Sequence, residues 1–273
     1  MKVLSNDSSG SRMWTPAWTL FLCLWITPLV ANAALRPEAK AKYQDYIAAL
    51  ETHLAVQNHA GSGFLWIDRD AQRQQSVRSG GIVTSHIGSV AVPGGMIQHW
   101  IGGVFFPGAS LEQIEQVDQD YADYARIYSP EISQPRVLSH QGDHFVVSYR
   151  ITKKKVLTAV MDTVHVIDYA RVGPDQLTIQ SRSESVRQVD DAGTPSEHVL
   201  AEGEGTGLLW AMNSYWRMQQ RDGGVYVECE AITLSRDVPF GMGRLIDPIL
   251  RSFAEESLKR TLEEKRQAVA SRR

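Results

Sequence analysis

Residues 213–234, NSYWRMQQRDGGVYVECEAITL, decide the fold. Asp222-Gly223-Gly224 at the centre of this segment is a strong signal for a tight β-hairpin turn, because such turns need positive φ angles that glycine adopts without steric cost. The residues on both sides alternate in character, as they do in half-buried strands. The segment therefore predicts two antiparallel strands whose two faces differ in chemistry.

A two-residue loop puts odd positions before the turn on the same face as even positions after it. One face is then large and apolar, carrying Trp210, Met212, Trp216, Met218, Val225, Val227, Cys229 and Ala231. The other face is charged and self-complementary, carrying Tyr215, Arg217, Gln219, Tyr226, Glu228 and Glu230. Pairing of Arg217 with Glu228 or Glu230 across the hairpin is typical of a solvated face. We therefore expect the charged face to be the outer surface.

The two glutamates also allow an enzymatic interpretation. Side chains two residues apart on a strand share a face, and two carboxylates in a cavity shift each other's pKa and can serve as acid and base. His165, on the same face of its strand as Met161, is a further candidate acid or base. Its simpler interpretation is a hydrogen-bonded core histidine, so both interpretations stay open here.

Length, charge and basic residues exclude some function classes. The chain has 273 residues and a formal net charge of -3, which suits one domain or at most two. The one basic block, at residues 153–155, is interpreted as strand-edge charge that discourages sheet association. We therefore expect no nucleic-acid partner.

The N-terminal segment, residues 1–33, is predicted to be a signal peptide. Lys2 and Arg12 precede an apolar stretch at residues 17–30, and Ala31-Asn32-Ala33 is an A-x-A cleavage site. We expect a periplasmic or secreted protein after cleavage near Ala33, with an uncleaved N-terminal membrane anchor as the alternative. Cleavage would leave Cys229 as the one cysteine, which cannot form an internal disulfide and is expected to be a buried, small apolar residue.

The rest of the chain divides into three helical segments and several strands. Helices are predicted at residues 37–57, 111–128 and 239–270, the second after Ser110 as N-cap and the third kinked or divided at Pro248. Strands are predicted at residues 64–67, 77–90, 100–106, 135–139, 144–153, 156–169 and 177–189.

Two stretches carry a family resemblance: GVFFPGASLEQIEQVDQDYADYARIYSPEI and LLWAMNSYWRMQQRDGGVYVECEAITLSRDVPFGMGRLIDPIL. Their order of strand, helix, antiparallel strands and closing helix resembles the START-like, helix-grip (SRPBCC) superfamily, in particular bacterial polyketide cyclase/dehydrase and lipid-transport proteins, over residues 100–262. The resemblance implies an α+β fold, with a curved antiparallel sheet gripping a long C-terminal helix around an apolar cavity. It places a START-like domain at residues 63–273 and makes the helix at residues 34–62 an extra element.

Large apolar residues on the strands and on the closing helix are the candidate ligand-binding residues. They are Met161, Trp210, Met212, Trp216, Met218, Phe240, Met242, Leu245, Ile249 and Phe253. Methionine adapts to irregular ligand shapes, which suits such a lining. The alternative is that these residues pack against each other and leave no cavity.

No sequence motif for catalysis or cofactor binding stands out. The chain lacks a nucleophile elbow, a P-loop, an HExxH motif and paired CxxC motifs. His140, Asp143 and His144 have a spacing that can bind metal, but without a further ligand we expect no metal site and no cofactor.

The favoured function is a carrier of an apolar small molecule such as a lipid or isoprenoid, with transient membrane contact. The alternatives are a cyclase-type enzyme using Glu228, Glu230 or His165, and an interaction domain without ligand; the sequence does not specify an oligomeric state.

The export hypothesis has a direct test. N-terminal sequencing of the protein made in a bacterial host should begin at Ala34, because the predicted cleavage follows Ala33. A full-length chain that fractionates with membranes would instead show that residues 17–30 act as an anchor.

Overall fold

The computed structural model describes residues 34–59, 63–154, 158–206, 208–236 and 243–272. The predicted signal peptide, and Phe240 and Met242 of the predicted lining, lie outside these ranges. Among the helices described, none combines the length and the apolar character needed to cross a membrane.

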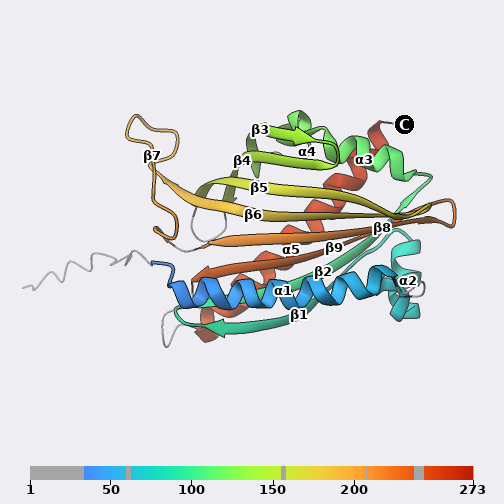
Figure 1. The fold of residues 1–273 in the computed structure, drawn as a ribbon, viewed down its shortest axis with the longest axis horizontal. Helices are drawn as coiled ribbons and strands as arrows, with labels where there is room; N and C mark the ends of the chain where they lie inside the picture. Colours follow the sequence, from blue (N-terminus) through green and yellow to red (C-terminus); the bar gives the residue numbers. More distant parts are fainter. Residues whose placement is uncertain (1–33, 60–62, 155–157, 207, 237–242, 273) are drawn as a thin grey trace, which may run out of the picture. The chain divides into compact units, whose positions relative to one another are not determined.

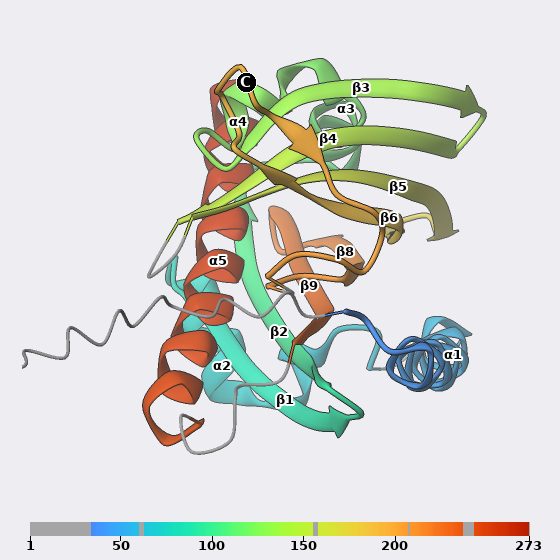
Figure 2. The same cartoon turned by 90° about the vertical axis from the view of Figure 1, so that its left-hand side faces the viewer.

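One nine-stranded antiparallel sheet dominates the structure (Figure 1), and it curves so that its concave side faces the C-terminal helix (Figure 2). The strand order is β1-β2-β9-β8-β6-β5-β4-β3, with short β7 beside β6. The strands are β1 (Ile82–Val92), β2 (Gly95–Pro107), β3 (Ile132–Gln141), β4 (His144–Lys154), β5 (Thr158–Gly173), β6 (Gln176–Asp190), β7 (His198–Val199), β8 (Ala211–Arg221) and β9 (Gly224–Arg236).

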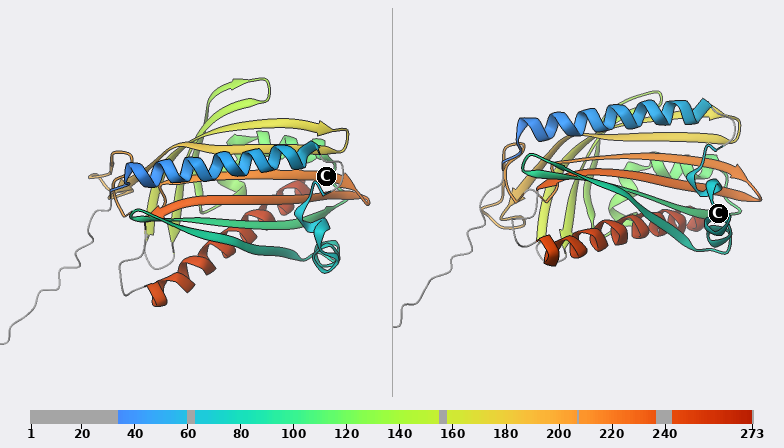
Figure 3. Two further views of the ribbon diagram at one scale, coloured as in Figure 1. Left: turned by 60° about the horizontal axis from the view of Figure 1, so that its bottom comes forward. Right: turned by 90° about the horizontal axis from the view of Figure 1, so that it is seen from below.

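Helices cover both faces of this sheet (Figure 3). Helix α5 (Gly243–Ser271) crosses the concave face, and helix α1 (Pro37–His59) runs along the opposite face. The remaining helical pieces are η1 (Trp66–Arg69), α2 (Ala71–Arg78), α3 (Leu111–Gln119), η2 (Tyr121–Asp123) and α4 (Tyr124–Ile127). A curved antiparallel sheet that grips a long C-terminal helix is the helix-grip architecture, so the predicted fold class and the extra N-terminal helix are confirmed.

The hairpin that predicted the fold forms as expected between β8 and β9. Its two-residue loop is Asp222-Gly223, with φ angles of 56° and 75°, both positive as a type I′ turn requires. In the resulting register Trp216 lies opposite Cys229, and Arg217 lies opposite Glu228. The separation into an apolar face and a charged face is therefore correct.

A pair of glycines in β2 allows helical layers to approach the same strand from both sides. A β-carbon built on Gly102 would lie 2.9 Å from Leu262 Cδ1 of α5, and one built on Gly103 would lie 2.6 Å from Ile67 Cγ2 of η1. Successive strand residues point to opposite faces. The Gly-Gly pair thus removes side chains at the two points where α5 and η1 come closest to β2.

Four predicted elements differ from the structure. Residues 64–67 lead into η1 and α2 instead of forming a strand, because the Asp70 side chain caps α2 by accepting a hydrogen bond from Arg73 N. Strand β1 accordingly begins only at Ile82, whereas a strand was expected from residue 77. The helix expected at residues 111–128 is broken at Asp120, whose ψ of 65° ends α3. Helix α5 continues through Pro248 as one element.

The buried side chains form a main core on the concave face and two clusters on the convex face. Helix α1 contributes the predicted stripe, with Tyr43, Ile47 and Leu54 buried against β2, β8 and β9, and Tyr46 and Leu50 partly buried beside them. Around η1 and α2, Phe64, Leu65, Ile67 and Val77 pack on Ile101, Phe105 and Tyr226. Both faces of the central strands are therefore covered.

Candidate functional site

A cavity of about 310 Å³ lies between the sheet and α5. Alternation along the central hairpin decides which side chains face it. Strand β8 presents Met212, Ser214 and Trp216, and β9 presents Cys229, Ala231 and Thr233. The wall is completed mainly by apolar residues of neighbouring elements, namely Ile132, Ile151, Ile167, Ile179, Leu208, Leu209, Ala254 and Leu258.

A buried ion pair forms part of this wall. Asp118 Oδ2 of α3 lies 2.8 Å from Lys265 Nζ of α5, and the two residues are 3% and 2% exposed. Burial raises the pKa of the Asp118 carboxyl, and the nearby Lys265 ammonium opposes that rise. The ammonium also lies 3.8 Å from the centroid of the Trp216 ring, a cation–π distance. The pair therefore gives one part of an otherwise apolar cavity a strong local dipole.

A second polar group in the wall is Lys153. Its Nζ donates hydrogen bonds to Glu131 Oε2 and Ser257 Oγ, each at 2.7 Å, and burial lowers its pKa to about 8. The expectation that residues 153–155 form a charged sheet edge is therefore wrong for Lys153, because β4 is covered by β3 and its side chain faces α5.

The predicted lining residues lie in different places. Met212 and Trp216 line the cavity, whereas Met161 and Met218 are buried in the main core without lining it. Trp210 packs in the cluster beneath α1, because it precedes the first residue of β8 and does not follow that strand's alternation. Phe240 and Met242 lie outside the described residues, and the side chains of Leu245, Ile249 and Phe253 are likewise not described.

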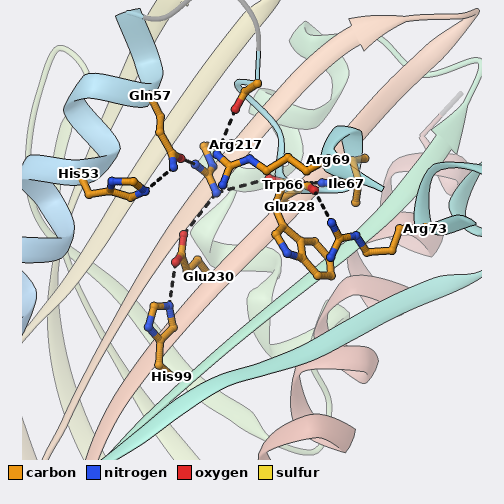
Figure 4. A network of polar contacts seen from close by, with 11 residues as sticks. His53, Gln57, Trp66, Ile67, Arg69, Arg73, His99, Arg217, Glu228 and Glu230 are labelled. Carbon is orange, nitrogen blue, oxygen red and sulfur yellow. Dashed lines mark hydrogen bonds and ion pairs between the residues drawn. The ribbon is translucent and has the colours of Figure 1, made fainter. Parts of the chain in front are cut away.

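The charged face of the hairpin is buried, which corrects the expectation of a solvated surface. Arg217, Glu228 and Glu230 are only 4%, 0% and 7% exposed. Helix α1 and the segment containing η1 cover them, as Figure 4 shows. Alternation identifies the two faces of a strand but does not say which is open to water, and a third layer was needed to bury this one.

These side chains form one connected polar network (Figure 4). Arg217 Nη2 lies 3.3 Å from Glu230 Oε2 and 3.5 Å from Glu228 Oε2, so the predicted cross-strand pairing is confirmed. Glu230 Oε1 is 2.7 Å from His99 Nε2 on β2. Arg217 Nη1 donates to Gln57 of α1. Glu228 Oε1 accepts a 2.6 Å hydrogen bond from the backbone N–H of Ile67.

The environment of Glu228 weakens its acidity. Burial raises its pKa to about 7, and the Arg217 guanidinium and the backbone N–H groups of Trp66 and Ile67 oppose the rise. The network nevertheless lies on the sheet face opposite the cavity, because the cavity is lined by Cys229 and Ala231 and not by their even-numbered neighbours. A ligand in the cavity does not meet Glu228 or Glu230.

His165 lies on the concave side but behind the cavity wall. It is fully buried, its ring stacks on Tyr149 with centroids 4.8 Å apart, and its Nδ1 lies 3.4 Å from Ser181 Oγ. Burial lowers its pKa to about 4, so the imidazole is neutral. Tyr149 and Ser181 line the cavity, and a ligand therefore contacts these residues in front of His165.

Sequence reasoning missed the polar residues that do line the cavity. Lys265 follows Leu258 and Leu262 at helical spacing, so a charged residue within the apolar stripe of the last helix was a usable signal. Asp118 was harder to find, because it directly follows the buried Val117 on a helix whose other acidic residues are not buried. Among the described residues, no group of three or more His, Cys, Asp or Glu side chains is arranged to hold a metal ion.

Comparison with known proteins gives similarity at the level of solved structures. No protein-family model matches the chain, and no curated protein matches it by sequence. Similar structures include the Zhui aromatase/cyclase from a Streptomyces species, with 16% identity over 64% of this chain and 93% of that chain and a TM-score of 0.42. Human STARD10 has 10% identity over 74% of this chain and 80% of that chain, with a TM-score of 0.43.

A STAR-related lipid transfer protein from Xanthomonas axonopodis is also similar, with 10% identity over 64% of this chain and 97% of that chain and a TM-score of 0.40. Both kinds of protein named by the sequence resemblance are thus among the similar structures. Such identities do not carry a function from one chain to another.

The buried network predicts a large stability effect at Arg217. Arg217→Ala should lower the free energy of unfolding by about 3–5 kcal/mol, because the buried carboxyl groups of Glu228 and Glu230 lose the guanidinium that they share. Urea denaturation measures this, with Arg126→Ala, which removes an exposed partner of Asp123, as the matched control that should stay close to wild type. A loss below about 1 kcal/mol at Arg217 would mean that the network is solvated after all.

The raised pKa of Glu228 predicts a pH dependence. The folded protein keeps this carboxyl protonated up to about pH 7, whereas the unfolded chain loses the proton near pH 4.5, so wild-type stability should fall as pH rises through this window. Glu228→Gln cannot ionise and keeps an acceptor for Ile67 N–H. As pH rises through this window, the free energy of unfolding of Glu228→Gln should therefore increase relative to that of wild type by on the order of 3 kcal/mol.

Equilibrium unfolding at several pH values measures this difference. Glu112→Gln is a suitable control, because hydrogen bonds to its own backbone N–H and to Ser110 lower the pKa of that carboxyl, so its difference from wild type should change only below pH 4.5 and stay constant across this window. Parallel stability curves for wild type and Glu228→Gln would contradict the assignment.

Proposed function

We propose that this protein is a carrier or binding protein for an apolar small molecule held between the sheet and α5. The observation that carries this proposal is the cavity of about 310 Å³ bounded by Met212, Trp216, Leu209, Ile167 and Leu258. Its volume is at the lower end of the range for small-molecule sites, and its combination of an apolar wall with a few polar groups is typical of them.

The cavity's chemistry indicates why such a molecule would bind. Burial of apolar surface is worth roughly 25 cal/mol per Å², so a compact apolar ligand gains several kcal/mol by leaving water. The buried charged groups Asp118 and Lys265 in the wall are paired with each other, as are Lys153 and Glu131. They therefore present little unpaired charge to a ligand.

The proposal includes the cellular setting predicted from the sequence. Export after cleavage near Ala33 would place the carrier in the periplasm or outside the cell, and the alternative anchor would tether it at a membrane surface. In both cases a carrier of lipid or isoprenoid would take up and release its ligand during transient membrane contact.

A second candidate function, a cyclase-type enzyme, is favoured by one observation. Asp118 and Lys153 both line the cavity, and burial shifts the pKa of each toward the neutral form. Such pairs in one cavity are candidates for proton transfer. This version of the enzyme hypothesis uses residues that a ligand can reach, unlike the version that relied on Glu228, Glu230 or His165.

Filling the cavity tests the binding proposal. Ala231→Phe places a phenyl ring into it from β9, so binding of an apolar fluorophore such as Nile red should be lost while the circular dichroism spectrum is retained. Ala170→Phe adds the same ring at an exposed position of β5 and should bind like wild type. Equal binding by both variants would show that the fluorophore binds elsewhere.

Native mass spectrometry of the purified wild-type protein distinguishes carrier from enzyme. A carrier should release a copurified molecule that is unchanged after prolonged incubation. An enzyme should convert it, and Lys153→Met should then stop conversion while binding persists.

A further inference from the structure

Two tyrosines in the cavity wall have hydroxyl groups that no described residue engages. Tyr128 follows α4 and Tyr149 lies on β4; both line the cavity and are only 8% and 9% exposed. Neither hydroxyl has a hydrogen-bond partner within the described parts of the chain. Because both residues line the cavity, their hydroxyls are free to donate to a molecule inside it.

The neighbouring tyrosines show the usual arrangement by contrast. The hydroxyls of Tyr124 and Tyr169 both donate to the backbone oxygen of Asp118, at 2.7 and 3.1 Å, and Tyr121 is bonded to Tyr169 at 2.8 Å. These three are satisfied by the protein itself. The two hydroxyls that are not satisfied are on residues in contact with the cavity, so a molecule in the cavity can supply their partner.

Both phenols act as hydrogen-bond donors at physiological pH. Burial raises the pKa of each, so each keeps its proton. Two neutral donors in an apolar wall favour an acceptor oxygen over a charged group.

We propose that Tyr128 and Tyr149 donate hydrogen bonds to an oxygen of the bound molecule, so that the cavity selects apolar molecules bearing a carbonyl or comparable acceptor over pure hydrocarbons of the same shape. This inference rests on the proposed binding function and deepens it by naming the ligand class. Shape and apolar surface supply affinity, and the two hydroxyls supply orientation, because a hydrocarbon would leave both donors unpaired.

A matched pair of ligands tests this assignment. An acetylnaphthalene carries a ketone oxygen, and the corresponding isopropenylnaphthalene has a methylene group in its place. Wild-type protein should bind the ketone at least about tenfold more tightly, which corresponds to one net hydrogen bond. Fluorescence titration measures both affinities, and the carbonyl stretching band of the bound ketone should move to lower frequency.

Tyrosine-to-phenylalanine variants assign the effect to these residues. Tyr128→Phe combined with Tyr149→Phe should remove the preference for the ketone and the band shift, while the hydrocarbon binds as before. Tyr226→Phe, on the opposite face of the sheet, is the control and should retain the preference. Thermal unfolding of each variant checks that the fold is kept.

The outcomes distinguish failure of this inference from failure of the proposed binding function. If the ketone and hydrocarbon bind wild type equally, or if the double variant keeps the preference, the hydroxyls do not select the ligand and the inference is wrong. If neither compound binds wild type while Ala231→Phe also leaves Nile red binding unchanged, the cavity is not a binding site and the proposed function fails as well.

Discussion

The guanidinium of Arg217, held between two glutamates at the centre of the sheet, requires that the convex face stay covered. An ion pair taken out of water is favourable only when its remaining hydrogen-bonding groups find partners. Here Gln57 of α1 supplies an acceptor to Arg217, and the backbone of Ile67 supplies a donor to Glu228. The N-terminal helix and the segment around η1 are therefore part of the domain's interior and not an appendage to it.

This covering has a consequence for the cavity on the other side. Trp216 and Cys229, which line the cavity, alternate along β8 and β9 with the buried charges. A strand whose two faces are both packed has little freedom to change register, since a shift of one residue would exchange every side chain between the faces. The buried network thus holds the cavity wall in one register, although it contributes no atom to the cavity.

The sequence predicted the architecture better than it predicted the site. Alternation around Asp222-Gly223 and the apolar stripe of α1 follow from local periodicity, and both are present. Which face of the hairpin meets water depends on a layer far away in the sequence, so the burial of Arg217 could not be deduced locally. The same limit applies to Asp118 and Lys265, which lie on separate helices and become a pair only through the packing of α5 on α3. Local periodicity also fails at Trp210. This residue lies one position before β8 begins, where the alternation of the strand no longer applies.

The adjacent glycines of β2 are two positions on one strand at which close packing limits the size of the side chain. At Gly102 the limiting contact is with α5 through Leu258 and Leu262, so a methyl group there would displace the leucine side chains with which α5 packs on the sheet. At Gly103 the limiting contact is Ile67, so a methyl group would loosen the segment that donates to Glu228 and leave α5 in place. Neighbouring positions in the chain thus limit the packing of α5 on one side of the sheet and the burial of charge on the other, so a substitution at either position acts first on one layer alone.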